Sequence, residues 1–129
     1  MILIEYIEDQ IEGEPGPNFL WKGQPEDFMR LVVDLHSLGT EDDLEVLVND
    51  FGYINVQNGN RVVLKSSLNG KTLVGVENNE LIIDLDKDIW REVLHYFLSV
   101  SFCPSHNFVE FDNLEVIELG NFIISSEAT

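Results

Sequence analysis

Two stretches of the sequence carry apolar residues at helical spacing, and they constrain the fold more strongly than any other feature. The stronger one begins at Asp86 or Asp88, and its stripe consists of Ile89 or Trp90, Val93, Leu94, Phe97, Leu98 and Phe102. The other runs from Gln24 to Leu38, and its stripe consists of Phe28, Leu31, Val32, Leu35 and Leu38. Residues three or four positions apart share one face of a helix, so each stripe needs another layer to cover it.

The residues at the ends of these stretches agree with two helices. Pro25 suits the first helical position, and the two acidic residues after it lie where the helix dipole favours negative charge. Gly39 is a suitable terminator for the first helix. An aspartate can cap the start of the second helix, and Pro104 disfavours the helical conformation in the residue before it. The second helix is therefore expected to end near Phe102.

Between the two helices the pattern changes to short β segments separated by turn dipeptides. Asn58-Gly59 and Asn69-Gly70 are favoured in two-residue hairpin turns, where both positions need positive φ, and Asn78-Asn79 is a third candidate. The strands expected here are Glu45 to Asn49, Tyr53 to Gln57, Arg61 to Ser66, Thr72 to Glu77 and Leu81 to Leu85. Because hairpins place consecutive strands side by side, this region is expected to form an antiparallel meander.

Further strands are expected on both sides of this region. They are Met1 to Ile7, Phe19 to Lys22, His106 to Phe111, Glu115 to Leu119 and, after a Gly120-Asn121 turn, Phe122 to Ser126. The sequence therefore predicts an α+β fold, with two amphipathic helices packed on one face of a mostly antiparallel sheet. At 129 residues, a single domain spanning residues 1–129 is expected. The helix residues expected to be buried are Phe28, Leu31, Leu35, Trp90, Val93, Leu94, Phe97 and Leu98.

The charge of the chain is unusual. There are 24 Asp and Glu residues against 7 Lys and Arg residues, which gives a formal net charge of -17. No Lys or Arg occurs in residues 1–21 or 92–129. Such a field repels nucleic acids and anionic membranes and speeds association with basic proteins. It also favours solubility, so charge alone does not choose between a basic partner and a simple surface role.

Three features predict a cytoplasmic protein. The apolar residues of MILIEYIEDQ follow no basic segment, so a secretory signal is not expected. No apolar run approaches the roughly 20 residues of a membrane helix. The single cysteine excludes an intramolecular disulfide, which fits a reducing compartment.

The segment SFCPSHNFVEFD places the cysteine close to a histidine and two carboxylates, so it is a candidate nucleophilic site. Cys103 follows a helix C-terminus, where the dipole disfavours a thiolate, and no Lys or Arg occurs after Arg91. His106 begins a strand, so its ring need not face the sulfur. The interpretation is a helix end followed by a strand, with Cys103 in a structural role.

No metal or cofactor site is expected either. His36, His95 and His106 are far apart in sequence and belong to no metal-binding motif. The aspartates of DLDKD resemble the start of a calcium loop, but the glycine and glutamate that such a loop requires are Ile89 and His95. No glycine-rich phosphate loop precedes either helix. We therefore do not expect the protein to be an enzyme. Among the alternatives for its function, an enzyme that uses unrecognised carboxylates is the least favoured.

Two groups of carboxylates are candidates for binding a partner. The first consists of Glu41, Asp42, Asp43, Glu45 and Asp50, and the second of Glu8, Asp9 and Glu12. Either group can also be a solvated turn. The first group follows a helix C-terminus, where acidic residues oppose the dipole, and a local cost of this kind points mildly to binding. No Lys or Arg occurs from Leu31 to Asn60, so we expect the field of this group not to be neutralised locally.

The acidic segments EDQIEGE and TEDDLE, and the predicted helix GQPEDFMRLVVDLHSLG with hairpins after it, suggest a class of protein. With its size and single cysteine, the chain resembles the small acidic α+β immunity proteins of bacterial polymorphic-toxin and contact-dependent inhibition systems. The resemblance implies a non-catalytic inhibitor that covers the active site of a cognate basic toxin, often a nuclease. The alternative is a self-associating scaffold module that forms a homodimer through an exposed sheet edge or face.

Overall fold

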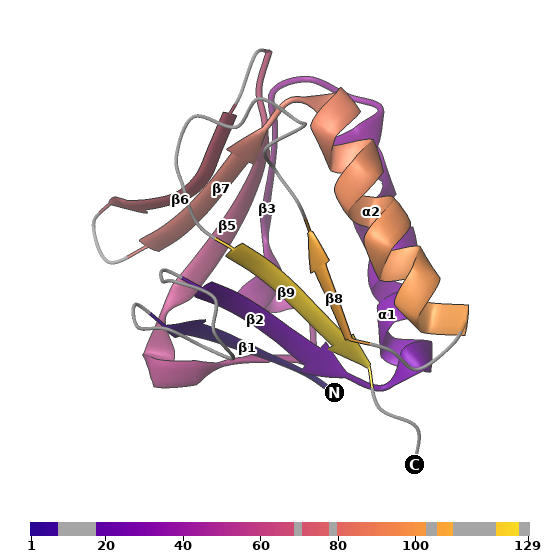
Figure 1. The fold of residues 1–129 in the computed structure, drawn as a ribbon. Helices are drawn as coiled ribbons and strands as arrows, with labels where there is room; N and C mark the ends of the chain where they lie inside the picture. Colours follow the sequence, from indigo (N-terminus) through magenta and orange to yellow (C-terminus); the bar gives the residue numbers. More distant parts are fainter. Residues whose placement is uncertain (8–17, 69–70, 78–79, 103–105, 110–120, 127–129) are drawn as a thin grey trace.

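The computed structural model describes residues 1–7, 18–68, 71–77, 80–102, 106–109 and 121–126, and the α+β class is confirmed (Figure 1). Its strands are β1 (Ile2–Ile7), β2 (Asn18–Gly23), β3 (Leu44–Leu47), β4 (Ile54–Val56), β5 (Arg61–Ser66), β6 (Lys71–Glu77), β7 (Glu80–Leu85), β8 (His106–Val109) and β9 (Asn121–Ser126). Its helices are α1 (Pro25–Asp34) and α2 (Lys87–Phe102). Short 3-10 segments are η1 (His36–Gly39), η2 (Val48–Asp50) and η3 (Gln57–Gly59).

The strands form two mixed sheets, whereas the sequence predicted one mostly antiparallel sheet. The five-stranded sheet has the order β4-β1-β2-β9-β8, and the four-stranded sheet has the order β3-β5-β7-β6. Within these sheets β1 and β4, β2 and β9, and β5 and β7 pair in parallel, and the other neighbours are antiparallel. Figure 1 shows the four-stranded sheet above the five-stranded one, with both helices beside them.

The prediction of an antiparallel meander between the two helices is wrong, because most of the turn dipeptides there do not join strands that are neighbours in a sheet. Asn58-Gly59 lies in η3, where Gly59 has φ +67°, but β4 and β5 belong to different sheets. Strand β7 lies between β5 and β6, so the connection that contains residues 69–70 is not a hairpin either. Only β6 and β7 pair as expected, and residues 78–79 between them lie outside the described part. A dipeptide that accepts positive φ indicates a change of direction, whereas the burial of side chains selects the strands that pair.

Helix α1 begins at Pro25 as predicted, but its α-helical part ends at Asp34 rather than at Leu38. The chain then tightens into η1, where the Leu38 amide donates to the Leu35 carbonyl at 3.0 Å. This 3-10 turn keeps Leu38 in the core, with no exposed side-chain surface. The apolar stripe was therefore correct, although the last turn has a different geometry.

Helix α2 is capped by Asp86, as the sequence allowed. The Asp86 Oδ1 atom accepts hydrogen bonds from the backbone amides of Asp88 and Ile89, each at 3.0 Å. These bonds satisfy two of the amides that a helix start leaves without a partner. The helix then passes close to Gly39, where an added Cβ would lie 2.8 Å from the Arg91 Cγ atom. Gly39 therefore allows η1 to pack directly against α2.

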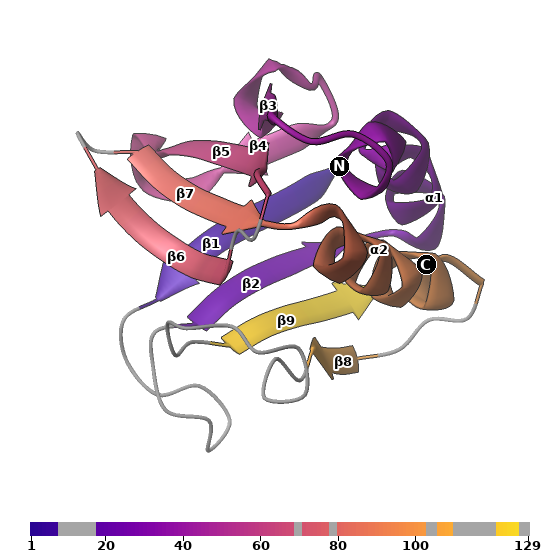
Figure 2. The same ribbon diagram turned by 90° about the horizontal axis from the view of Figure 1, so that it is seen from above.

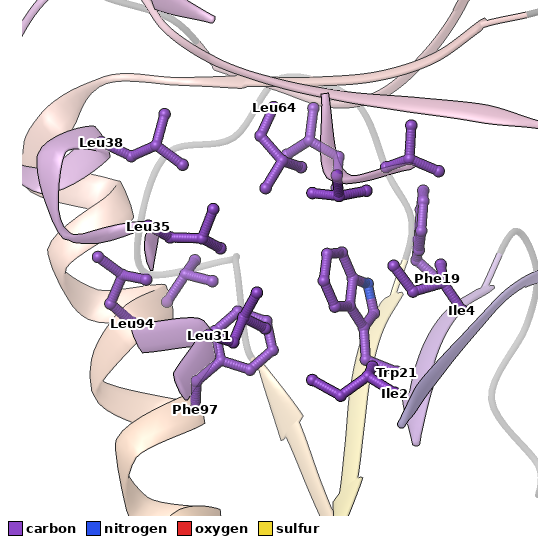
Figure 3. Packing of buried hydrophobic residues seen from close by; sticks show 14 of the residues in the cluster. Ile2, Ile4, Phe19, Trp21, Leu31, Leu35, Leu38, Leu64, Leu94 and Phe97 are labelled. Carbon is purple, nitrogen blue, oxygen red and sulfur yellow. The ribbon is translucent and has the colours of Figure 1, made fainter. Parts of the chain in front are cut away.

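The buried apolar side chains of both sheets and both helices form one core cluster. Figure 2 shows α1 and α2 side by side next to the sheets, and Figure 3 shows Trp21 between the helix residues Leu31 and Phe97 and the strand residue Phe19. The rings of Trp21 and Phe97 lie 5.3 Å apart, and those of Phe28 and Phe97 lie 5.8 Å apart. Among the helices of the described residues, none combines the length and apolar character needed to cross a membrane.

Most of the predicted helix core is confirmed. The buried residues are Phe28, Leu31, Leu35, Trp90, Val93, Leu94 and Phe97. The prediction is wrong for Leu98, which is half-buried, and Phe102 of the same stripe is 74% exposed. Phe102 is the last residue of α2, two positions beyond the last buried one, Val100. The helical pattern therefore continues past the part of α2 that the sheets cover.

Candidate functional site

The first carboxylate group divides between the two ends of β3. Glu41, Asp42 and Asp43 precede this strand, Glu45 lies in it, and Asp50 follows it in η2. All five side chains are exposed. The four residues of β3 span about 13 Å at 3.3 Å per residue, so the structure does not gather the group into one cluster. Glu8, Asp9 and Glu12 of the second group lie outside the described residues.

The turn before β3 is held by its backbone, which leaves its side chains free to project. The Glu41 amide donates to the Ser37 carbonyl at 2.9 Å, and the fully buried Ser66 hydroxyl donates to the Glu41 carbonyl at 2.5 Å. Asp43 has φ +58°, a left-handed conformation that aspartate tolerates better than most residues. The carboxylates therefore stand on a defined turn.

Two lysines from other parts of the chain lie near this group, which corrects the expectation that nothing neutralises it. The Lys87 Nζ atom is 3.8 Å from the Asp42 Oδ2 atom, and both side chains are partly exposed. Lys65 on β5 is directly opposite Glu45 on β3, where side chains share a face. In the described residues no ion pair involves Glu41, Asp43 or Asp50. These three carboxylates carry the uncompensated charge.

Strand β3 is the edge of the four-stranded sheet, a feature that the sequence interpretation missed. It pairs only with β5, and within the described chain its outer edge makes no hydrogen bond to another element. An edge strand presents unpaired amide and carbonyl groups to which another strand can bind. Two features of the sequence could have indicated an edge strand, namely its short length and the charged residues around it, since edge strands in native proteins commonly have both.

An apolar row crosses the outer face of this sheet next to β3. Leu47, Val63 and Ile82 are register neighbours on β3, β5 and β7. Val62 and Leu64 belong to the core cluster, so Val63 between them points to the other face. Val63 is only 2% exposed, while Leu47 and Ile82 are half-buried. Leu47 and Ile82 therefore leave some apolar surface accessible beside the charged ends of β3, with the buried Val63 between them.

The helices form a concave surface. A groove of about 230 Å³ lies between α1, η1 and α2. Its apolar lining residues are Val32, Leu94 and Leu98, and its polar ones are His36, Thr40, Arg91 and His95. The fold thus brings together two histidines that are far apart in sequence. Among the described residues no three His, Cys, Asp or Glu side chains are arranged to hold a metal ion.

The segment Ser101 to Asp112 is described only in part. Cys103 lies outside the described residues, so its structural role stays a prediction. His106 begins β8, which pairs antiparallel with β9, in agreement with the predicted strand.

Tyr53 connects α1 to the segment before β4. Its hydroxyl donates to the Asp34 Oδ2 atom at 2.6 Å, and the Arg30 guanidinium lies 4.3 Å from its ring centroid. Phe51 stacks on the same ring, with centroids 5.8 Å apart. Burial, followed by the hydrogen bond to Asp34 and the charge of that residue, raises the pKa of Tyr53 above its ordinary value. The phenol is therefore held in its neutral form.

Replacing Tyr53 by phenylalanine is expected to change how stability depends on alkaline pH. A raised pKa in the folded state gives stability that is complete below the unfolded value of about 10 and is lost as pH rises toward the folded value. Urea unfolding of the wild type should therefore show stability falling above about pH 10. Tyr53→Phe should lower the free energy of unfolding by about 1 kcal/mol at neutral pH, because the hydrogen bond to Asp34 is lost. The stability of this variant should then fall less than that of the wild type above about pH 10. Tyr96→Phe is the control, and an equal fall in both variants would contradict this assignment.

Comparison with protein-family models, with curated proteins and with solved structures finds no significant match to this chain.

Proposed function

We propose that the protein is a non-catalytic binding protein, an immunity protein that neutralises a cognate basic toxin in the bacterial cytoplasm by occluding its active site. The observation that supports this best is the open edge of β3 with uncompensated carboxylates at both ends. A partner segment in extended conformation can add to such an edge through main-chain hydrogen bonds. Lysine or arginine side chains of that segment would then lie near Glu41 and Asp43 at one end and Asp50 at the other.

The other properties of the surface are consistent with this mode of binding. The net charge of -17 accelerates the approach of a basic protein, because the summed field acts before contact. The half-buried side chains of Leu47 and Ile82 lie at or near the edge and supply apolar contact of the kind that high affinity requires. Inhibition by covering a site needs neither turnover nor a cofactor.

The open edge also favours one alternative, a homodimer in which the β3 strands of two copies pair with each other. An antiparallel pair of this kind would place the turn before β3 in one copy near Asp50 of the other. Like charges that meet in this way destabilise the pair. A basic partner is therefore favoured over a second copy.

The proposal is tested by isolating the partner and mapping its contact. The tagged protein is used to capture partners from a lysate of its source, and each partner is expressed alone and together with the wild-type chain. We expect to capture a basic protein that stops growth when it is expressed alone and is harmless when it is expressed together with the wild-type chain. Hydrogen exchange should slow at the β3 amides in the complex, with the amides of β8, an edge strand of the five-stranded sheet, as the control. An acidic partner, or exchange that slows only at β8, would refute this site.

A further inference from the structure

The groove between the helices differs in charge from the rest of the protein. Among the described residues that line it there is no carboxylate, although Asp and Glu outnumber Lys and Arg by 24 to 7 in the chain. Arg91, His36 and His95 line it together, and Thr40 adds a hydroxyl. An imidazole donates an N–H bond in either protonation state, and an arginine offers five donors. The polar part of this lining is therefore suited to an anionic group.

The rest of the lining is apolar, and the groove is open to solvent on one side. Val32 comes from α1, and Leu94 and Leu98 come from α2. Small-molecule sites typically combine an apolar surface with a few polar groups that orient the ligand. A volume of about 230 Å³ lies between that of a cavity that binds benzene, about 150 Å³, and the lower limit for drug-sized ligands, about 300 Å³. The space suits one ring or a short aliphatic chain with a single charged group.

We propose that this groove binds a small organic monocarboxylate, with the carboxylate held by Arg91 and the two histidines and the apolar part against Val32, Leu94 and Leu98. The site shares no residue with the β3 edge, so it does not depend on the proposed function. A carboxylate matches the guanidinium fork, which can form two parallel hydrogen bonds to it. A bare inorganic anion would leave the apolar lining without a contact.

Arg91 already forms an ion pair within the protein, so a ligand carboxylate must compete with that partner. Its Nη2 atom forms an ion pair with Asp88 one turn earlier on α2, and both side chains are exposed. Exposed pairs of this kind contribute little to stability, so removing Asp88 should affect the fold only slightly. Asp88 competes with a ligand carboxylate for the same guanidinium. Asp88→Asn should therefore strengthen binding about threefold, while Arg91→Gln should weaken it about tenfold or more.

The test is an NMR titration of the full chain with benzoate at constant pH, following the imidazole signals of His36 and His95. Benzamide, which has nearly the same shape without the charge, and inorganic phosphate, which lacks the apolar part, are the matched probes. Benzoate should shift both signals and bind at least about tenfold more tightly than either probe. Arg30→Gln on α1 is the control for Arg91→Gln, because Arg30 lies over Tyr53 outside the groove.

Three results would overturn the proposal. One is the absence of any benzoate shift at His36 and His95. Another is equal binding of benzamide or phosphate, since the groove would then recognise only shape or only charge. The third is unchanged benzoate affinity in Arg91→Gln, measured in a variant whose other signals show an intact fold.

Discussion

Phe97→Ala is expected to lower the free energy of unfolding by about 3–5 kcal/mol, the range for removing a large aromatic side chain from a packed core. Phe97 has no exposed surface and lies between the rings of Trp21 and Phe28. These neighbours come from β2 and α1, so the cavity would open where both helices meet the five-stranded sheet. Equilibrium unfolding in urea, followed by circular dichroism, measures the loss.

The same substitution at Phe102 is the matched control. Phe102 lies on the same helix and is 74% exposed, so Phe102→Ala should change stability by no more than about 0.5 kcal/mol. Similar losses in the two variants would contradict the position of α2 against the sheets. They would indicate that the last turn of the helix is buried after all.

The second large effect is expected in the rate at which the partner associates. Glu41→Lys combined with Asp43→Asn should slow association about tenfold or more at low ionic strength, because it weakens the attraction at one end of β3. Asparagine is chosen at position 43 because it tolerates positive φ as aspartate does. Near physiological salt the Debye length is about 8 Å, so the difference between variant and wild type should become smaller. Stopped-flow kinetics with the captured partner at two salt concentrations measures both effects.

A control with the same change in net charge separates a local effect from a global one. Glu92→Lys combined with Glu26→Gln alters exposed residues on α2 and α1, away from β3. If this control slows association as much as the β3 variant, the partner responds to total charge and does not contact the edge strand. If neither variant changes the rate, electrostatic attraction does not guide the encounter.

The helices were predictable from the sequence because each is encoded locally. The stripe of α2 and its cap at Asp86 depend on residues within a few positions of each other. The sheets were not predictable in the same way. Pairing of β2 with β9, or of β5 with β7, depends on which apolar faces meet in the core, and turn dipeptides carry no information about that choice. The error at Asn58-Gly59 has this cause.

The candidate sites show the same division between local and long-range information. The exposure of Glu41 to Asp43 followed from their charge, and the sequence predicted it. The contact of Lys87 with Asp42 and the edge position of β3 result from packing between distant segments. The groove lined by His36 and His95 is formed in the same way, by two helices whose separation in sequence conceals their proximity.

The place of β9 between β2 and β8 has an effect on how the protein is made in the cell. Asn18 pairs with Asn121, so the second edge of β2 is covered only after about a hundred further residues have been synthesised. Ribosomes add about 5–20 residues per second, and pairing over such a separation in sequence is slow. The five-stranded sheet is therefore completed only after β9 has been synthesised, and until then one edge of the strand that contains Phe19 and Trp21 has no pairing partner.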